Sequence, residues 1–197
     1  MLAPFRIEEV TLRFPDRTFS GQQTEVIAGR TVELVDHGAA HTASDSVVFL
    51  PESRVAFTGD LLFAHVTPVM WHGPLARWLA ALDAMMALEA DVYVPGHGPV
   101  SRRAELKALH DYWTWLRDAV QAHKSAGRSP LEIAKLLTGT REFDAFRGWE
   151  SPERIYVNVA TIDRDLDGKG PLPTNPIARV RAFDGIACVS QHLGRSR

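Results

Sequence analysis

The segment VYVPGHGPV, residues 92–100, constrains the fold more than any other stretch of this 197-residue chain. Its first residues predict a short buried strand, and Pro95 has no backbone N–H with which to continue a strand ladder. Glycine adopts backbone angles that other residues avoid, so Gly96 and Gly98 permit a sharp change of direction on either side of His97. The segment therefore predicts a strand that ends abruptly and fixes His97, either as a ligand or within a structural turn.

The preceding residues read mainly as strands. Alternating apolar and polar residues predict a strand over residues 10–14 and two hairpins, over 24–35 and 46–60. The first hairpin turns at Ala28 and Gly29, and the second turns at residues 51–53. Between residues 73 and 91 the apolar residues recur at helical spacing instead, beginning just after Pro74.

After residue 101 the pattern becomes helical. One apolar stripe predicts a helix from Leu106 to Val120 that ends near Gly127, and SPLE at 129–132 begins the next helix with a capping box. The sequence SPER at 151–154 begins another, and DRDLDGKG at 163–170 reads as a helix end because a calcium loop would need Glu where Thr174 stands. We therefore predict a sheet-and-helix domain over residues 1–101 and a helical region over 102–197.

Composition excludes several classes of function. A net charge of −2 favours neither a nucleic-acid surface nor an acidic tail, and no apolar run is long enough to cross a bilayer. The first residues are charged too early for a secretion signal, and the single Cys188 forms no internal disulfide. These features predict a cytoplasmic protein that binds neither nucleic acid nor membrane.

Three polar residues stand where predicted strands begin or end. His41 precedes the strand VVFL, Asp60 follows VAF, and His97 follows VYV. Strand ends of an open sheet lie together, and two imidazoles with one carboxylate suit zinc or a mononuclear iron site. Serine-hydrolase chemistry is excluded by the absence of a Gly-x-Ser-x-Gly elbow, and Pro99 removes an amide that a dinucleotide turn would use.

The segments AHTASDSVVFLPESRVAFTGDLLF and VYVPGHGPV resemble the metallo-β-lactamase superfamily. The resemblance implies an α/β (α+β) fold, the second half of a four-layer αββα sandwich, here followed by a helical region. It implies up to two zinc ions, with iron or manganese as alternatives, in which His41 binds the first, Asp60 bridges both and His97 binds the second. Asp45 would orient the ligand loop. His65 and His72 would fall along the substrate cleft, unless they are solvent-facing loop residues.

The chain lacks the His-x-His-x-Asp-His cluster that marks this superfamily. We therefore expect an N-terminally truncated metal-dependent hydrolase, whose metal-bound hydroxide attacks a small-molecule ester, amide, thioester or phosphoester. The alternative is a non-catalytic relic that acts as a binding or dimerisation module. In either case a sheet without its second half exposes an apolar face, which predicts self-association or poor solubility.

Overall fold

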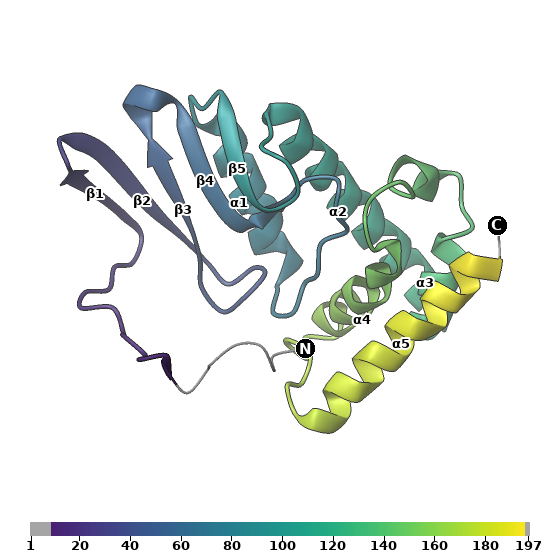
Figure 1. Ribbon diagram of the computed structural model, residues 1–197. Coiled ribbons are helices and arrows are strands. Elements are labelled where there is room, and N and C mark those ends of the chain that lie inside the picture. The colour runs from purple at the N-terminus through teal and green to yellow at the C-terminus, as the bar shows by residue number, and fades with distance from the viewer. Residues whose placement is uncertain (1–8, 196–197) are drawn as a thin grey trace.

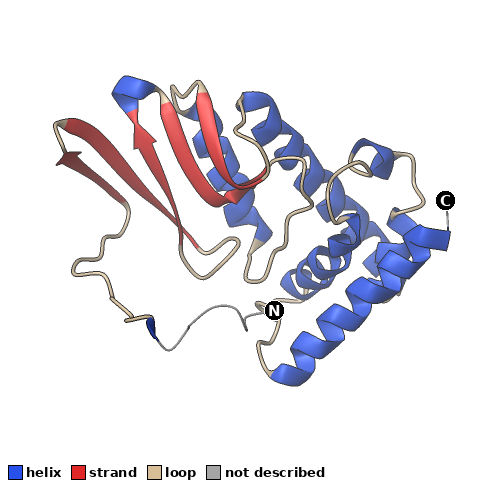
Figure 2. Ribbon diagram, in the orientation of Figure 1, coloured by secondary structure: helices blue, strands red, loops and turns tan. Residues whose placement is uncertain are grey.

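A computed structural model of the protein describes residues 9–195 as a five-stranded sheet followed by helices (Figures 1 and 2). The strands are β1 (Gln22–Ile27), β2 (Arg30–Gly38), β3 (Asp45–Leu50), β4 (Val55–Phe63) and β5 (Val92–His97). The helices are α1 (Leu75–Ala87), α2 (Arg103–Ser125), α3 (Pro130–Leu137), α4 (Ile155–Leu166) and α5 (Pro176–Arg195). The mixed α/β fold class is therefore confirmed.

Both predicted hairpins are present. β1 and β2 pair through a turn in which Ala28 and Gly29 have φ values of 51° and 77°, the conformation that matches the twist of two-residue hairpins. A short 3₁₀ helix, Pro51–Ser53, joins β3 to β4. The strand predicted over residues 10–14 is wrong. No strand within residues 9–195 pairs with this segment, and Val10, Leu12 and Phe14 are 65%, 79% and 79% exposed.

The sheet has the order β1-β2-β3-β4-β5, with β4 and β5 parallel and the other pairs antiparallel. A parallel pair needs a crossover connection, which the segment containing α1 supplies between β4 and β5. Because parallel strands end at the same edge, this pairing carries Asp60 and His97 to one end of the sheet.

The predicted helix ends are also present. The Ser129 hydroxyl accepts from the Glu132 amide at the start of α3, and the Glu132 carboxylate accepts from the Ser129 amide, which is the predicted capping box. α2 ends just before Gly127, whose φ is 75°, and α4 ends at Leu166 within the segment predicted as a helix end. Residues 152–154 form a 3₁₀ turn that leads directly into α4.

One hydrophobic core runs through both parts of the chain. It includes Val47 and Phe49 of the sheet, Trp78 of α1, Trp113 of α2 and Ile155 of α4. The Trp78 and Trp113 rings lie 4.8 Å apart and join α1 to α2. The division of the chain at residue 102 stays a prediction, and the helical region packs against the sheet-bearing part over this shared core. None of the helices formed by the described residues is both long and apolar enough to span a membrane.

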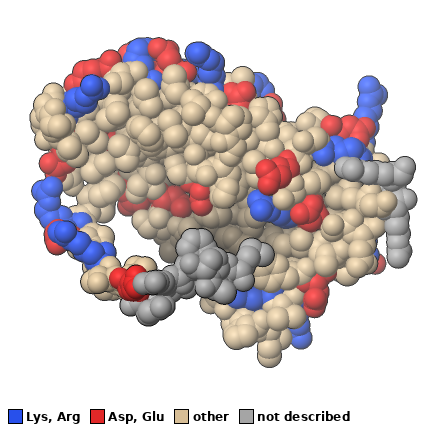
Figure 3. All heavy atoms as spheres, viewed as in Figure 1, with Lys and Arg blue, Asp and Glu red and all other residues tan. Residues whose placement is uncertain are grey.

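Helices α1 and α2 lie against one face of the sheet and leave the other face open (Figure 1). Cross-strand partners Leu34, Val48, Phe57 and Val94 form one apolar row on the open face. Leu50, Val55 and Val92 form a second row beside it. We call these seven residues the open sheet face. Phe57 is 43% exposed, and the surface over the strands in Figure 3 carries few charges away from its rim.

Candidate metal centre

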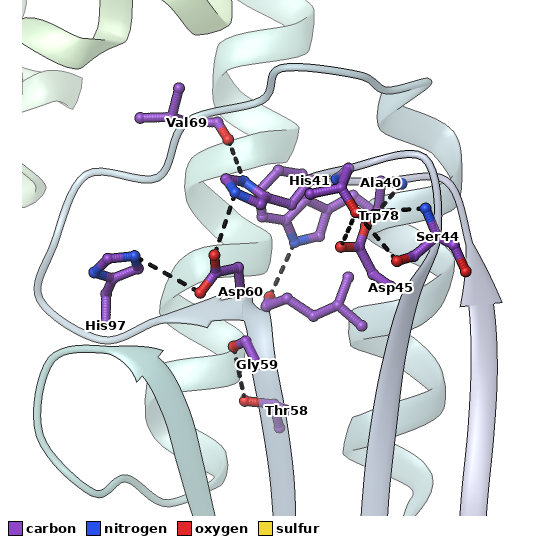
Figure 4. Close-up of polar contacts among 12 residues, drawn as sticks. Ala40, His41, Ser44, Asp45, Thr58, Gly59, Asp60, Val69, Trp78 and His97 are labelled. Carbon is purple, nitrogen blue, oxygen red and sulfur yellow. Dashed lines mark hydrogen bonds and ion pairs between the residues drawn. The ribbon is translucent and has the colours of Figure 1, made fainter. Parts of the chain in front are cut away.

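Two histidines meet one carboxylate at the end of the sheet (Figure 4). His41 Nε2 lies 3.3 Å from Asp60 Oδ2, and His97 Nε2 lies 3.7 Å from Asp60 Oδ1. The three residues come from the β2–β3 loop, from β4 and from the end of β5. The structure thus brings together the three residues that the sequence singles out as metal ligands, and their metal binding itself stays a prediction.

The glycines of residues 92–100 explain how His97 reaches this position. A Cβ on Gly96 would stand 1.9 Å from Asp60 Oδ1 and 2.8 Å from the Gly59 carbonyl carbon. Gly98 has a φ of 93°, and a Cβ there would stand 1.9 Å from the Ala64 carbonyl oxygen. Both glycines therefore allow the backbone around His97 to approach β4 more closely than any other residue could.

The loop that carries His41 is held from both sides. Asp45 Oδ2 accepts hydrogen bonds from the Ala40 and Thr42 amides, at 3.1 and 2.9 Å, so one carboxylate clamps the residues on either side of His41. The Thr42 hydroxyl donates to Asp45 Oδ1 at 2.8 Å. This placement suits the loop-orienting role that the resemblance implies for Asp45.

The His41 ring is also fixed in its tautomer. His41 Nδ1 lies 2.6 Å from the Val69 carbonyl oxygen, which can only accept, so Nδ1 carries a proton. In a neutral imidazole Nε2 then presents a lone pair, and that lone pair faces the Asp60 carboxylate. Two acceptors face each other across this gap, an arrangement that is stabilised by a cation, either a second proton on the ring or a metal ion.

Aromatic rings shape the site. Phe63 stacks on the His97 ring at 4.6 Å and lies 5.6 Å from the His41 ring. Trp78 meets the edge of His41 at 5.8 Å, while its indole N–H donates to the Leu61 carbonyl at 3.0 Å. The His41 side chain is only 11% exposed, whereas that of His97 is 48% exposed, so one end of the site is buried and the other is open.

The two predicted cleft histidines differ in position. His72 lines a cavity of about 470 Å³ together with Ala39, Ala43 and Arg77, beside the loop that holds His41. His65 lies apart from that cavity, and its Nε2 is 3.8 Å from Glu105 Oε1 of α2. The cleft assignment of both residues stays a prediction.

The donor types at this centre fit zinc, which binds imidazole nitrogen and carboxylate oxygen. The number of donors is small. Within residues 9–195, no group of three or more His, Cys, Asp or Glu side chains is arranged to hold a metal ion. His41 and His97 approach different oxygens of Asp60, so the described residues form two pairs that share one carboxylate.

The first part of the chain resembles a known family of metal-binding proteins. Residues 3–97, just under half of the chain, match the family model described as the metallo-beta-lactamase superfamily. The superfamily generally binds metal ions, and its hydrolytic members include β-lactamases.

The chain is similar to the 2,4-dinitroanisole O-demethylase subunit alpha of Nocardioides sp. (strain JS1661), at 29% identity over 49% of this chain and 30% of the relative. It is also similar to the linear primary-alkylsulfatase of Pseudomonas sp. (strain ATCC 19151), at 28% identity over 61% of this chain and 25% of the relative. The chain thus spans less than a third of either curated relative.

Among solved structures, a metallo-beta-lactamase family protein from Thermus thermophilus superposes with a TM-score of 0.57 at 21% identity. The superposition covers 79% of this chain and 50% of the other, which supports the fold assignment beyond the sheet.

The sequence reasoning missed two groups near the centre, the Val69 carbonyl and the Phe63 ring. Phe63 belongs to the apolar end of β4, where nothing in the local pattern distinguishes it from a core residue. A backbone carbonyl carries no sequence signal at all.

Proposed function

We propose that the chain contributes His41, Asp60 and His97 to the metal site of a zinc-dependent hydrolase that acts on a small-molecule ester. The observation that carries this proposal is the convergence of two imidazoles on one carboxylate. Zinc bound there would supply a hydroxide near neutral pH. His41, Asp60 and His97 would hold the metal, and Phe63 would restrict water around the His97 ring.

We propose further that the remaining ligands come from a polypeptide segment outside the described residues, in a longer chain or a partner, and that this segment packs on the open sheet face. Catalytic zinc sites commonly take three ligands from protein, more than either His–Asp pair supplies here. The open sheet face adjoins the centre through β4, which carries both Phe57 and Asp60.

The alkylsulfatase relative suggests a sulfate ester as one substrate to test. We expect zinc-dependent hydrolysis of at least one of 4-nitrophenyl acetate, 4-nitrophenyl phosphate and 4-nitrophenyl sulfate, slow because the donor set is incomplete. Chelation with EDTA should abolish it, and added zinc should restore it. His110→Gln is the matched control, because His110 pairs with Asp83 away from the centre, and it should retain the rate. Equal rates for the wild type and for His97→Ala on all three substrates would contradict the proposal.

The second candidate is a non-catalytic binding or dimerisation module. It is favoured by the exposure of Phe57 in the middle of an apolar face, because exposed apolar patches of this kind mark interaction sites. We expect the chain to sediment as a dimer at micromolar concentration, and Phe57→Glu to convert it to a monomer. Val26→Glu is the matched control, because Val26 is also exposed but lies on the opposite face of the sheet. A wild-type chain that sediments as a monomer at every concentration would remove this candidate.

A further inference from the structure

Asn158 in α4 is completely buried, and its side chain forms three hydrogen bonds. Its Oδ1 accepts from the Met70 amide at 2.9 Å. Its Nδ2 donates to the Pro68 carbonyl at 2.9 Å and to the Tyr112 hydroxyl at 2.9 Å. Burial raises the pKa of the Tyr112 hydroxyl, so that group stays neutral as an acceptor. One amide side chain therefore forms hydrogen bonds to the residues on both sides of Val69.

Val69 is the residue whose carbonyl holds the His41 ring. The His41 Nδ1–H donates to this carbonyl at 2.6 Å, and the opposite ring nitrogen, Nε2, faces Asp60. A displacement of the Val69 peptide would therefore either rotate the imidazole away from Asp60 or break the hydrogen bond that keeps the proton on Nδ1.

The residues next to Val69 lie outside the sheet ladder, and side chains of α4 bond to their backbone groups. Thr161, one helical turn after Asn158, donates its hydroxyl to the Met70 carbonyl at 2.7 Å. Thr161 is 1% exposed, so this bond too is sheltered from water. Two side chains of α4 thus fix the amide and the carbonyl of Met70 and the carbonyl of Pro68.

We propose that Asn158 is a positioning residue for His41. The helical region thereby sets the orientation of a metal ligand that belongs to the sheet, through the path Asn158, Val69, His41. This inference rests on the proposed function in one respect, the assignment of His41 as a metal ligand.

The test is Asn158→Leu, which keeps a side chain of similar size but removes all three hydrogen bonds. The first readout is the His41 Nδ1–H proton in NMR spectra of metal-free protein, assigned by its disappearance in His41→Gln. We expect a slowly exchanging downfield signal in the wild type that is lost or broadened in Asn158→Leu. The second readout is zinc affinity, measured with zinc alone, which we expect to fall by about 10- to 100-fold.

Val159→Ala is the matched control, because it truncates a completely buried neighbour on α4 that forms none of these bonds. It should leave both the His41 signal and zinc affinity unchanged. If Asn158→Leu does not fold, Thr161→Val removes one bond to the same loop and should broaden the same signal to a smaller extent.

The outcomes separate this inference from the proposed function. A wild type that binds no zinc would contradict the proposed function, and the His41 signal would still decide the positioning role. The inference would be overturned if the His41 signal were unchanged in Asn158→Leu, whatever the zinc affinity of that variant. If Asn158→Leu fails to fold, an unchanged signal in Thr161→Val would overturn it.

Discussion

Gly98→Ala is expected to lower the free energy of unfolding by about 2–5 kcal/mol. Two costs combine at this residue. Its φ of 93° is rarely adopted by residues with a side chain, and the added methyl group would stand 1.9 Å from the Ala64 carbonyl oxygen. That carbonyl belongs to the backbone and cannot rotate away, so the end of β5 must separate from β4. Urea denaturation followed by circular dichroism measures the change.

Gly127→Ala separates the two costs. Gly127 has a φ of 75°, but a Cβ there would meet nothing within 4 Å. Its substitution should therefore cost only the backbone strain, about 1–2 kcal/mol. If both variants lose the same stability, the close approach of residues 96–98 to β4 does not constrain the fold in the way proposed here.

Asp60→Asn is expected to abolish zinc binding and zinc-dependent turnover without loss of stability. The substitution preserves the shape of the side chain but removes the charge that the two histidines share. An amide N–H in place of Oδ2 would donate to the lone pair of His41 Nε2. A hydrogen bond would then replace the contact between two acceptors. We therefore expect an unfolding free energy equal to that of the wild type or slightly higher, together with the loss of zinc binding measured by calorimetry.

The chain offers a matched control for that substitution. Asp83 Oδ1 lies 3.4 Å from His110 Nε2 and forms a second Asp–His pair, between α1 and α2 and away from the centre. Asp83→Asn should leave zinc binding intact. Loss of zinc binding in both variants would mean that the metal does not depend on the centre at the end of β4.

The parts of the fold that depend on local chemistry follow from the sequence. The Ala28-Gly29 turn, the Ser129 capping box and the apolar stripe of α2 are all encoded within a few neighbouring residues. The wrong strand prediction at residues 10–14 also came from a local pattern. Alternation alone does not make a strand, because a strand also needs a neighbour that the local pattern cannot supply.

The candidate site was predictable only in part. His41, Asp60 and His97 stand beside recognisable strands, so their meeting at the strand ends follows from sheet topology. The contacts that orient His41 do not follow, because Asn158 is separated from Pro68 by 90 residues and from Met70 by 88. The hydrogen-bond partners of a buried asparagine in an amphipathic helix can be identified only when the position of the helix against the loop is known.

Zinc stoichiometry is the decisive test of the metal centre. The purified chain is dialysed to equilibrium against increasing zinc, and bound metal is measured by elemental analysis for the wild type, His97→Ala and His65→Gln. We predict weak binding that saturates at about one equivalent in the wild type and in His65→Gln, and is lost in His97→Ala. Zinc binding that is absent from the wild type, or that survives in His97→Ala, would contradict the assignment of His41, Asp60 and His97 as a metal centre.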